Sequence, residues 1–332
     1  MRLLLLLIFL CGDLSVCKAT IKDLTKTDVI FDTDANNELD DQHALAYLLF
    51  NSDVFNVKGI TVNATRNGGD IHLQLTEAKR VMQLCNSYEK IPLLPGANKD
   101  FVSISDSVKQ PDFDGASAVK FIISQSLAKR SNKLVILAVG KLTNVALALK
   151  IMPSIVSKIK VVWLGSNYPD PGEYNLEDDI PALNYVLSTE VQFEMVVVRY
   201  GAESGSGAVR AKKADIEQIM PGKGPKIEVP VEGRNGHTFL CFGDYSVDLF
   251  NHIPEYLQDS SRALFDMTAV AILKNPHWGK SSAIPAPYYS KENDGWVQWL
   301  DNQRKIIYWD QFNKDAIMTD FYNSMSHYHL PE

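Results

Sequence analysis

Cysteine is scarce in this chain: its 332 residues include four, and nothing in their spacing demands a disulfide. Two of the four, Cys11 and Cys17, lie in an N-terminal leader, which leaves Cys85 and Cys241 in the rest of the chain. We expect these two side chains to pack without reacting. Whether they pair stays open at this point.

Positive charge is also in deficit. Lysine and arginine together number 33, against 40 aspartates and glutamates, which gives a formal net charge of −7. A chain with this balance is not expected to bind a nucleic-acid polymer or an anionic membrane surface. A small molecule is the expected partner.

Long apolar runs are absent beyond the first residues. A basic start at Arg2 and the apolar run 3–10, which is too short to cross a bilayer comfortably, predict a secretory signal peptide over residues 1–19. Cleavage is expected after Cys17 or Ala19. The mature protein is then expected to be extracellular, or periplasmic in a bacterium, with no membrane span.

Internal repeats and low-complexity linkers are missing too, so we expect residues 20–332 to form one domain. Short β-rich runs alternate with helical patterns, which predicts an α/β fold with an open, mainly parallel sheet and helices on both faces. The expected strands are Val29–Phe31, Val57–Asn63, Leu134–Val139, Ile159–Leu164, Glu194–Val198 and Arg304–Trp309. The expected helices are Ile71–Cys85, Ala116–Ala128, Asn144–Ile151, Ile180–Leu187, Leu264–Leu273 and Phe312–Tyr322, with a further helix from about Asp40.

Acidic side chains are concentrated where the first strand meets this further helix. Asp32, Asp34, Asp40 and Asp41 fall within ten residues. Carboxylates packed so closely repel one another unless a cation or strong hydrogen-bond donors lie among them. Hard oxygen ligands favour Ca²⁺ or Mg²⁺. The alternative is that one aspartate caps the helix and the others are solvated.

Neutral polar side chains follow other predicted strands. Asn63 ends the second strand, and the later segments 140–144, 165–167 and 173–175 place further polar groups at strand ends. Carboxylates and amides together suit a polyhydroxylated ligand, because hydroxyl groups donate to carboxylates and accept from amides. A phosphate would call for a glycine-rich loop or arginines, so we expect a sugar.

Five blocks of this sequence resemble the nucleoside hydrolase family, the inosine–uridine preferring N-ribohydrolases, along nearly the whole mature chain. The blocks are Asp32-Thr33-Asp34 with Asp40-Asp41, Gly59 to Asn63, Val139 to Ala148, Gly165-Ser166-Asn167 with Glu173-Tyr174-Asn175, and Asp266 in its alanine-containing helix. The resemblance implies calcium-dependent hydrolysis of the N-glycosidic bond of ribonucleosides to ribose and free base. It also implies a homodimer or homotetramer.

The family's residue roles transfer position by position. The resemblance implies that Asp34 is the general base that activates water, and that Asp32 is a supporting residue. The implied calcium ligands are Asp34, Asp41, Asp266 and the backbone carbonyl of Thr143. The implied ribose-binding residues are Asp40, Asn63, Asn167, Glu173 and Asn175.

Two features depart from the family pattern. The loop 35–39 is two residues longer than in the common aspartate motif and lacks its proline and glycine. Phe265 stands where many members have a histidine that protonates the leaving base. The base must then leave with help from another acid or from aromatic stacking, for which Trp278, Tyr245 and His237 are weak candidates. Base preference is expected to depend on the variable segments 65–70, 168–172 and 230–255.

Two other functions stay open. A relative that binds nucleosides or calcium without turnover is consistent with Phe265 and the altered loop. A haloacid-dehalogenase-type phosphatase is suggested by Asp32-Thr33-Asp34, which matches an Asp-x-Asp nucleophile motif. That motif has threonine or valine two residues after its second aspartate, and this chain has Asn36 there.

Overall fold

The computed structural model describes residues 26–253 and 260–332. The predicted signal peptide, residues 1–19, lies outside the described residues. Within the described ranges, none of the helices combines the length and the apolar character that a membrane span needs.

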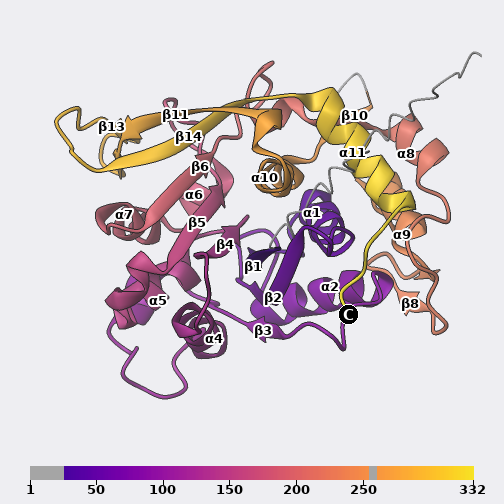
Figure 1. Ribbon diagram of the computed structural model, residues 1–332, viewed down its shortest axis with the longest axis horizontal. Helices are drawn as coiled ribbons and strands as arrows, with labels where there is room; N and C mark the ends of the chain where they lie inside the picture. The colour runs from indigo at the N-terminus through magenta and orange to yellow at the C-terminus, as the bar shows by residue number, and fades with distance from the viewer. Residues whose placement is uncertain (1–25, 254–259) are drawn as a thin grey trace, which may run out of the picture.

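A mostly parallel sheet of eight strands forms the centre of the molecule (Figure 1). In spatial order its strands are β11 (Gly279–Pro285), β14 (Lys305–Phe312), β6 (Gln192–Val196), β5 (Ile159–Leu164), β4 (Leu134–Ala138), β1 (Thr27–Thr33), β2 (Phe55–Val62) and β3 (Leu93–Pro95). The pairing of β11 with β14 is antiparallel, and the other pairings are parallel. The α/β prediction is therefore confirmed, and each expected strand overlaps an observed one.

Apolar side chains cover both faces of the sheet because successive residues of a strand point to opposite sides. In β1, Phe31 belongs to one buried cluster and its neighbour Ile30 to the other. Helices α1 (Leu39–Leu49), α2 (Ile71–Leu84), α8 (Lys213–Ile219), α9 (Phe242–His252), α10 (Phe265–Lys274) and α11 (Lys314–Ser326) pack on the first face. Helices α3 (Phe101–Ser105), α4 (Ala116–Leu127), α5 (Thr143–Ile151), α6 (Tyr174–Asp178) and α7 (Ile180–Ser188) pack on the second.

The shorter elements were not expected from the sequence. They include the hairpins β8 (Val231–Glu232) with β9 (Thr238–Phe239) and β12 (Tyr288–Ser290) with β13 (Gly295–Val297), and the pair β7 (Arg210–Lys212) with β10 (Ser261–Ala263). Strands of two or three residues are too short to show an alternating pattern. Helix α9 was missed as well, although Phe242, Tyr245 and Leu249 recur at helical spacing and are buried.

The order of the strands places a crevice at the end of β1. From β1 the chain continues to β2 and β3 on one side, whereas β4, β5 and β6 follow on the other side. Strands β1 and β4 are therefore the neighbours at which the winding direction changes. In open parallel sheets, ligands bind outside the carboxyl ends of such strands.

Candidate active site

A cavity of about 370 Å³ opens beside the residues that follow β1 and β4. Its lining consists of Asp34, Asn37, Glu38, Asp40, Asp41, Asn67, Val139, Leu164, Glu173, Tyr174, Asn175, Val198, Tyr200, Arg262, Phe265 and Asp266. Six of these side chains are carboxylic acids, and Arg262 is a cation. The cavity is therefore strongly acidic.

Four aspartates of the lining converge from three elements. Asp34 follows β1, Asp40 and Asp41 lie in the first turn of α1, and Asp266 lies in the first turn of α10. One carboxylate oxygen from each of Asp40, Asp41 and Asp266 lies within 4.8 Å of the other two. Helices α1 and α10 pack against each other, so both present their positive N-terminal ends to this cluster.

Burial makes ionisation of this cluster costly. It raises the pKa of Asp34, Asp41 and Asp266 well above the ordinary value, and the neighbouring carboxylates raise these pKa values further. Burial also raises the pKa of Asp40, to about 7, although backbone N–H groups, including those of Phe265 and Asp266, oppose the rise. A cation among these carboxylates would compensate their charge and favour their ionised form.

The donors present fit a hard divalent cation. Asp34 Oδ2 is buried and has no hydrogen-bond partner among the described residues, whereas Asp41 Oδ1 accepts a hydrogen bond from the Thr33 hydroxyl. An unpaired buried carboxylate oxygen is costly unless a ligand satisfies it. All the groups offered are oxygens, which Ca²⁺ and Mg²⁺ prefer.

Asp32 lies below the cavity and is held by three donors. Its carboxylate accepts hydrogen bonds from the Thr61 hydroxyl and from the side-chain amides of Asn63 (2.7 Å) and Asn144 (2.8 Å). Burial nevertheless raises the pKa of Asp32 to about 6. Because the donors come from β2, the residue after it and α5, Asp32 joins these segments beneath the site.

Gly140, after β4, allows the close packing of this layer. A Cβ atom at this position would lie 2.7 Å from Asp34 Oδ1 and 2.9 Å from Asn63 Oδ1. A larger residue would therefore displace the Asp34 carboxylate. Asn63 itself lies beneath the cavity lining, and its Oδ1 is buried without a partner among the described residues.

The loop after β5 brings two predicted substrate residues to the cavity. Glu173 accepts hydrogen bonds from the backbone N–H groups of Ser166 (2.8 Å) and Leu176 (2.9 Å). The Asn175 amide donates to two strand-end carbonyls, those of Val139 (2.8 Å) and Leu164 (3.1 Å). Ser166 and Glu173 have positive φ angles, 90° and 149°, and strained backbone of this kind is typical of functional loops.

Besides Asn63, two predicted ligands lie outside the lining. The Thr143 hydroxyl donates to Asp179 Oδ2, and Asn167 Oδ1 accepts a hydrogen bond from the backbone N–H of Arg199 (3.0 Å). In this structure both side chains hold neighbouring loops. The role of Asn167 in ribose binding stays a prediction.

The aromatic side chains and the cation that line the cavity were not predicted from the sequence as parts of the site. Tyr174, Tyr200 and Phe265 line it, and the Tyr200 ring meets the Phe265 ring edge-on, with centroids 5.6 Å apart. Arg262 forms an ion pair with Glu38 of the lengthened loop. Arg262 and Tyr200 follow no recognisable spacing in the sequence. The position of Tyr174 between Glu173 and Asn175, and that of Phe265 directly before Asp266, gave a signal.

The three weak candidates for the leaving-group acid lie elsewhere. The hydroxyl of Tyr245 donates to Glu77 in the core, and Trp278 packs against the first apolar cluster. The side chain of His237 is 63% exposed and pairs with Asp248. None of the three lines the cavity.

Comparison with solved structures finds the same fold in several nucleoside hydrolases. A plant nucleoside hydrolase has a TM-score of 0.68 and 16% identity, over 90% of this chain and 99% of that chain. A purine-preferring ribonucleoside hydrolase from Gardnerella vaginalis has a TM-score of 0.69 and 17% identity, over 90% and 98%. An inosine-guanosine nucleoside hydrolase has a TM-score of 0.69 and 17% identity, over 92% and 99%. At such identities the likeness shows the fold alone.

The family follows from the sequence. Comparison with curated proteins gives no match. The family model described as inosine-uridine preferring nucleoside hydrolase matches residues 29–310, which contain all four clustered aspartates and the loop of Glu173. The chain belongs to the inosine-uridine preferring nucleoside hydrolase family.

Proposed function

We propose that this nucleoside N-ribohydrolase cleaves the N-glycosidic bond of ribonucleosides in the acidic cavity, with Ca²⁺ as cofactor and Asp34 as general base. One observation carries the proposal: Asp40, Asp41 and Asp266 of α1 and α10 approach within 4.8 Å of one another in the cavity that Asp34 also lines, and Asp34 Oδ2 is buried with no partner among the described residues. The family match supports the reaction class, and the all-oxygen donor set supports the choice of cation.

The carboxylates divide into groups by their surroundings. Asp34, Asp41 and Asp266 would hold the cation, and Thr143 would add its backbone carbonyl as the family resemblance implies. When bound, Ca²⁺ supplies a positive charge that holds a water and lowers its pKa. Asp34 then accepts a proton from the attacking water. Asp32 takes no direct part and fixes the segments beneath Asp34 through its three donors.

The ribose is expected to lie against the polar side of the cavity. Asp40, Glu173 and Asn175 line it and offer carboxylate and amide groups to hydroxyls. Cleavage of the glycosidic bond develops positive charge on the sugar ring. An acidic cavity stabilises that charge electrostatically. Asn63, one layer below, would orient the site through Asp32 or reach the sugar after a side-chain rotation.

The departing base is expected to meet the aromatic side of the cavity. Phe265 cannot donate a proton, so the base must be assisted by stacking and by other donors. Tyr174 is held in place because its hydroxyl receives hydrogen bonds from Thr65 (2.7 Å) and the Asn67 N–H (2.9 Å), while the Arg66 guanidinium lies 4.0 Å from its ring centroid. Tyr200 and Arg262 add a hydroxyl and a cation to the same lining.

The proposal is tested by measuring ribose release from inosine, guanosine, adenosine, uridine and cytidine by folded, calcium-loaded protein. Release from at least one nucleoside is expected. Failure with all five would contradict the enzymatic role and favour the relative that binds without turnover, which Phe265 suggests. Release of inorganic phosphate from a phosphomonoester would instead support the phosphatase.

Secretion and assembly also remain proposals. The signal peptide predicted from the sequence over residues 1–19 supports export of the enzyme, which would then act on extracellular or periplasmic nucleosides. Assembly as a homodimer or homotetramer follows from the family resemblance. Sedimentation of the mature chain, residues 20–332, measures the second proposal directly.

A further inference from the structure

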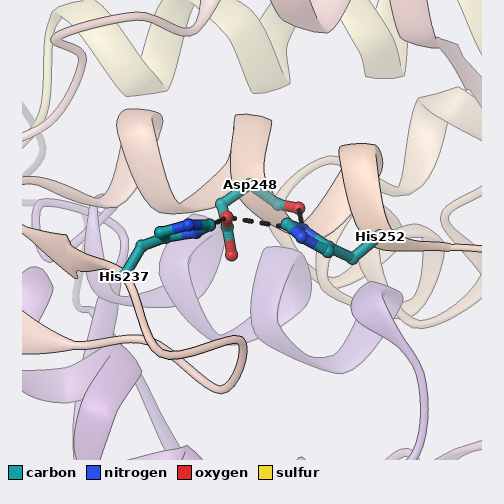
Figure 2. Close-up of side chains that lie close together, drawn as sticks. All are labelled: His237, Asp248 and His252. Atoms are coloured by element: carbon teal, nitrogen blue, oxygen red, sulfur yellow. Dashed lines mark hydrogen bonds and ion pairs between the residues drawn. The ribbon is translucent and has the colours of Figure 1, made fainter.

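A second group of metal-binding side chains lies away from the cavity, on the outer surface of α9. Asp248 and His252 are one helical turn apart on α9, and His237 reaches them from the loop between β8 and β9 (Figure 2). One ligand atom from each of the three side chains lies within 4.8 Å of the other two. None of the three residues lines the acidic cavity.

The carboxylate of Asp248 lies between the two imidazoles. Its Oδ1 is 2.8 Å from His237 Nδ1 and 3.4 Å from His252 Nδ1. The Asn235 amide donates to the other carboxylate oxygen, Oδ2, at 2.9 Å. Amide donation of this kind fixes a ligating carboxylate in metal centres. Asp248 is therefore held in place on one side and faces two imidazoles on the other. His252 Nδ1 also lies 2.8 Å from the backbone carbonyl of Asp248, a contact that a bound ion would replace.

Solvent can reach the group from outside. The side chains of His237 and His252 are 63% and 44% exposed, whereas that of Asp248 is 8% exposed. An ion bound here would have three protein ligands, with space for water at a further position. Two imidazole nitrogens and one carboxylate oxygen are a donor set typical of Zn²⁺ and related transition metals, whereas Ca²⁺ prefers oxygens alone.

We propose that His237, Asp248 and His252 form a binding site for a divalent transition-metal ion of the Zn²⁺ type, separate from the aspartate cluster. An ion at this site fastens the β8–β9 hairpin to α9. Each imidazole binds the ion through Nδ1 as a neutral ring, with its single ring proton on Nε2.

The position of the hairpin gives this site a route to the cavity. Arg234, three residues before His237, donates from Nη2 to the backbone carbonyl of Asn36 at 3.0 Å. Asn36 lies in the lengthened loop that connects Asp34 to Asp40. A metal ion that fixes the hairpin therefore also restrains the loop that carries the general base.

The test is Zn²⁺ binding by isothermal titration calorimetry, with the protein kept saturated in Ca²⁺ so that the aspartate cluster is occupied. Wild-type protein is expected to bind one Zn²⁺ per chain. His237→Ala and His252→Ala should each weaken this binding at least 100-fold. Asn235→Ala, which removes the donor to Asp248, should weaken it about 10-fold. His277→Ala, which removes an exposed histidine elsewhere, is the matched control and should bind as wild type does.

Spectroscopy of the wild-type protein provides a second measurement that needs no variant. Zn²⁺ should shift the imidazole NMR resonances of two of the histidines and leave the others in place. Zn²⁺ binding that is equally tight in wild type and His237→Ala would overturn the proposal, since it would place the ion on the carboxylates. Absence of binding at micromolar Zn²⁺ in the wild type would overturn it as well.

Discussion

The replacement Gly140→Ala tests whether the position of Asp34 matters to catalysis. The added Cβ would lie 2.7 Å from Asp34 Oδ1, and ordinary contacts begin at 3.4 Å. The carboxylate must therefore move by roughly 0.7 Å, and displacements of about 1 Å at reacting groups cost about 100-fold in rate. We expect kcat for the best nucleoside substrate to fall about 30-fold to 100-fold. The change in KM should be smaller, because the added Cβ approaches Asn63, at 2.9 Å, but leaves Glu173 and Asn175 undisturbed.

Stability measurements separate this displacement from unfolding. Overpacking a buried layer costs about 1–3 kcal/mol, so Gly140→Ala should stay folded with a lowered melting temperature. Gly295→Ala is the matched control, because its nearest contact would be 3.6 Å away. Its activity and its free energy of unfolding should stay at wild-type values, within about 0.5 kcal/mol. An unchanged kcat in folded Gly140→Ala would refute the claim that catalysis depends on the present position of the Asp34 carboxylate.

Three further predictions follow from the cavity. Asp34→Asn should lower kcat by about 10³-fold, which is within the range for loss of a general base. Calorimetry should still detect Ca²⁺ binding, although weakened. Turnover at the wild-type rate would show that Asp34 is not the general base. In chelator-treated protein, the free energy of unfolding should fall as the pH rises from about 4 through 7, because the folded protein holds the Asp40 proton up to a pKa of about 7 and the unfolded chain does not. Melting temperatures with and without Ca²⁺ should diverge across this interval. Parallel curves would argue against a cation among the carboxylates. The kcat/KM for inosine should exceed that for 2′-deoxyinosine by about 10⁴-fold if the 2′-hydroxyl is bound. It should exceed that for inosine 5′-phosphate at least ~100-fold, because six carboxylates line the cavity and repel the phosphate. Equal values would contradict these assignments.

The sequence predicted the acidic centre of the site because its signals are local. Asp32, Asp34, Asp40 and Asp41 fall within ten residues at a strand-to-helix junction, and charge repulsion alone indicates a function for them. Asp266 was assigned only through the family resemblance, since nothing in the sequence shows that α10 packs against α1. The structure places it beside Asp40 and Asp41.

Other parts of the site depend on tertiary contacts that have no sequence pattern. Arg262 reaches the cavity from strand β10 and Tyr200 from the loop after β6, far apart in the chain, and no periodicity marks either. The position of Asn167 in a family block suggested a ribose contact, yet its side chain caps the backbone of Arg199. The same limit applies to the edge of the sheet, where the antiparallel strand β11 was not predicted, whereas the mainly parallel character of the sheet was predicted correctly.

The most direct test of the account is a calcium titration of chelator-treated protein, followed by ribose release from a saturating nucleoside. Almost no ribose release is expected without added metal. With added Ca²⁺, the rate of ribose release should rise in parallel with Ca²⁺ binding measured on the same sample, and should saturate at one active-site Ca²⁺ per chain. Full ribose release by protein shown to contain no metal would contradict the claim that the carboxylates of β1, α1 and α10 act around a cation.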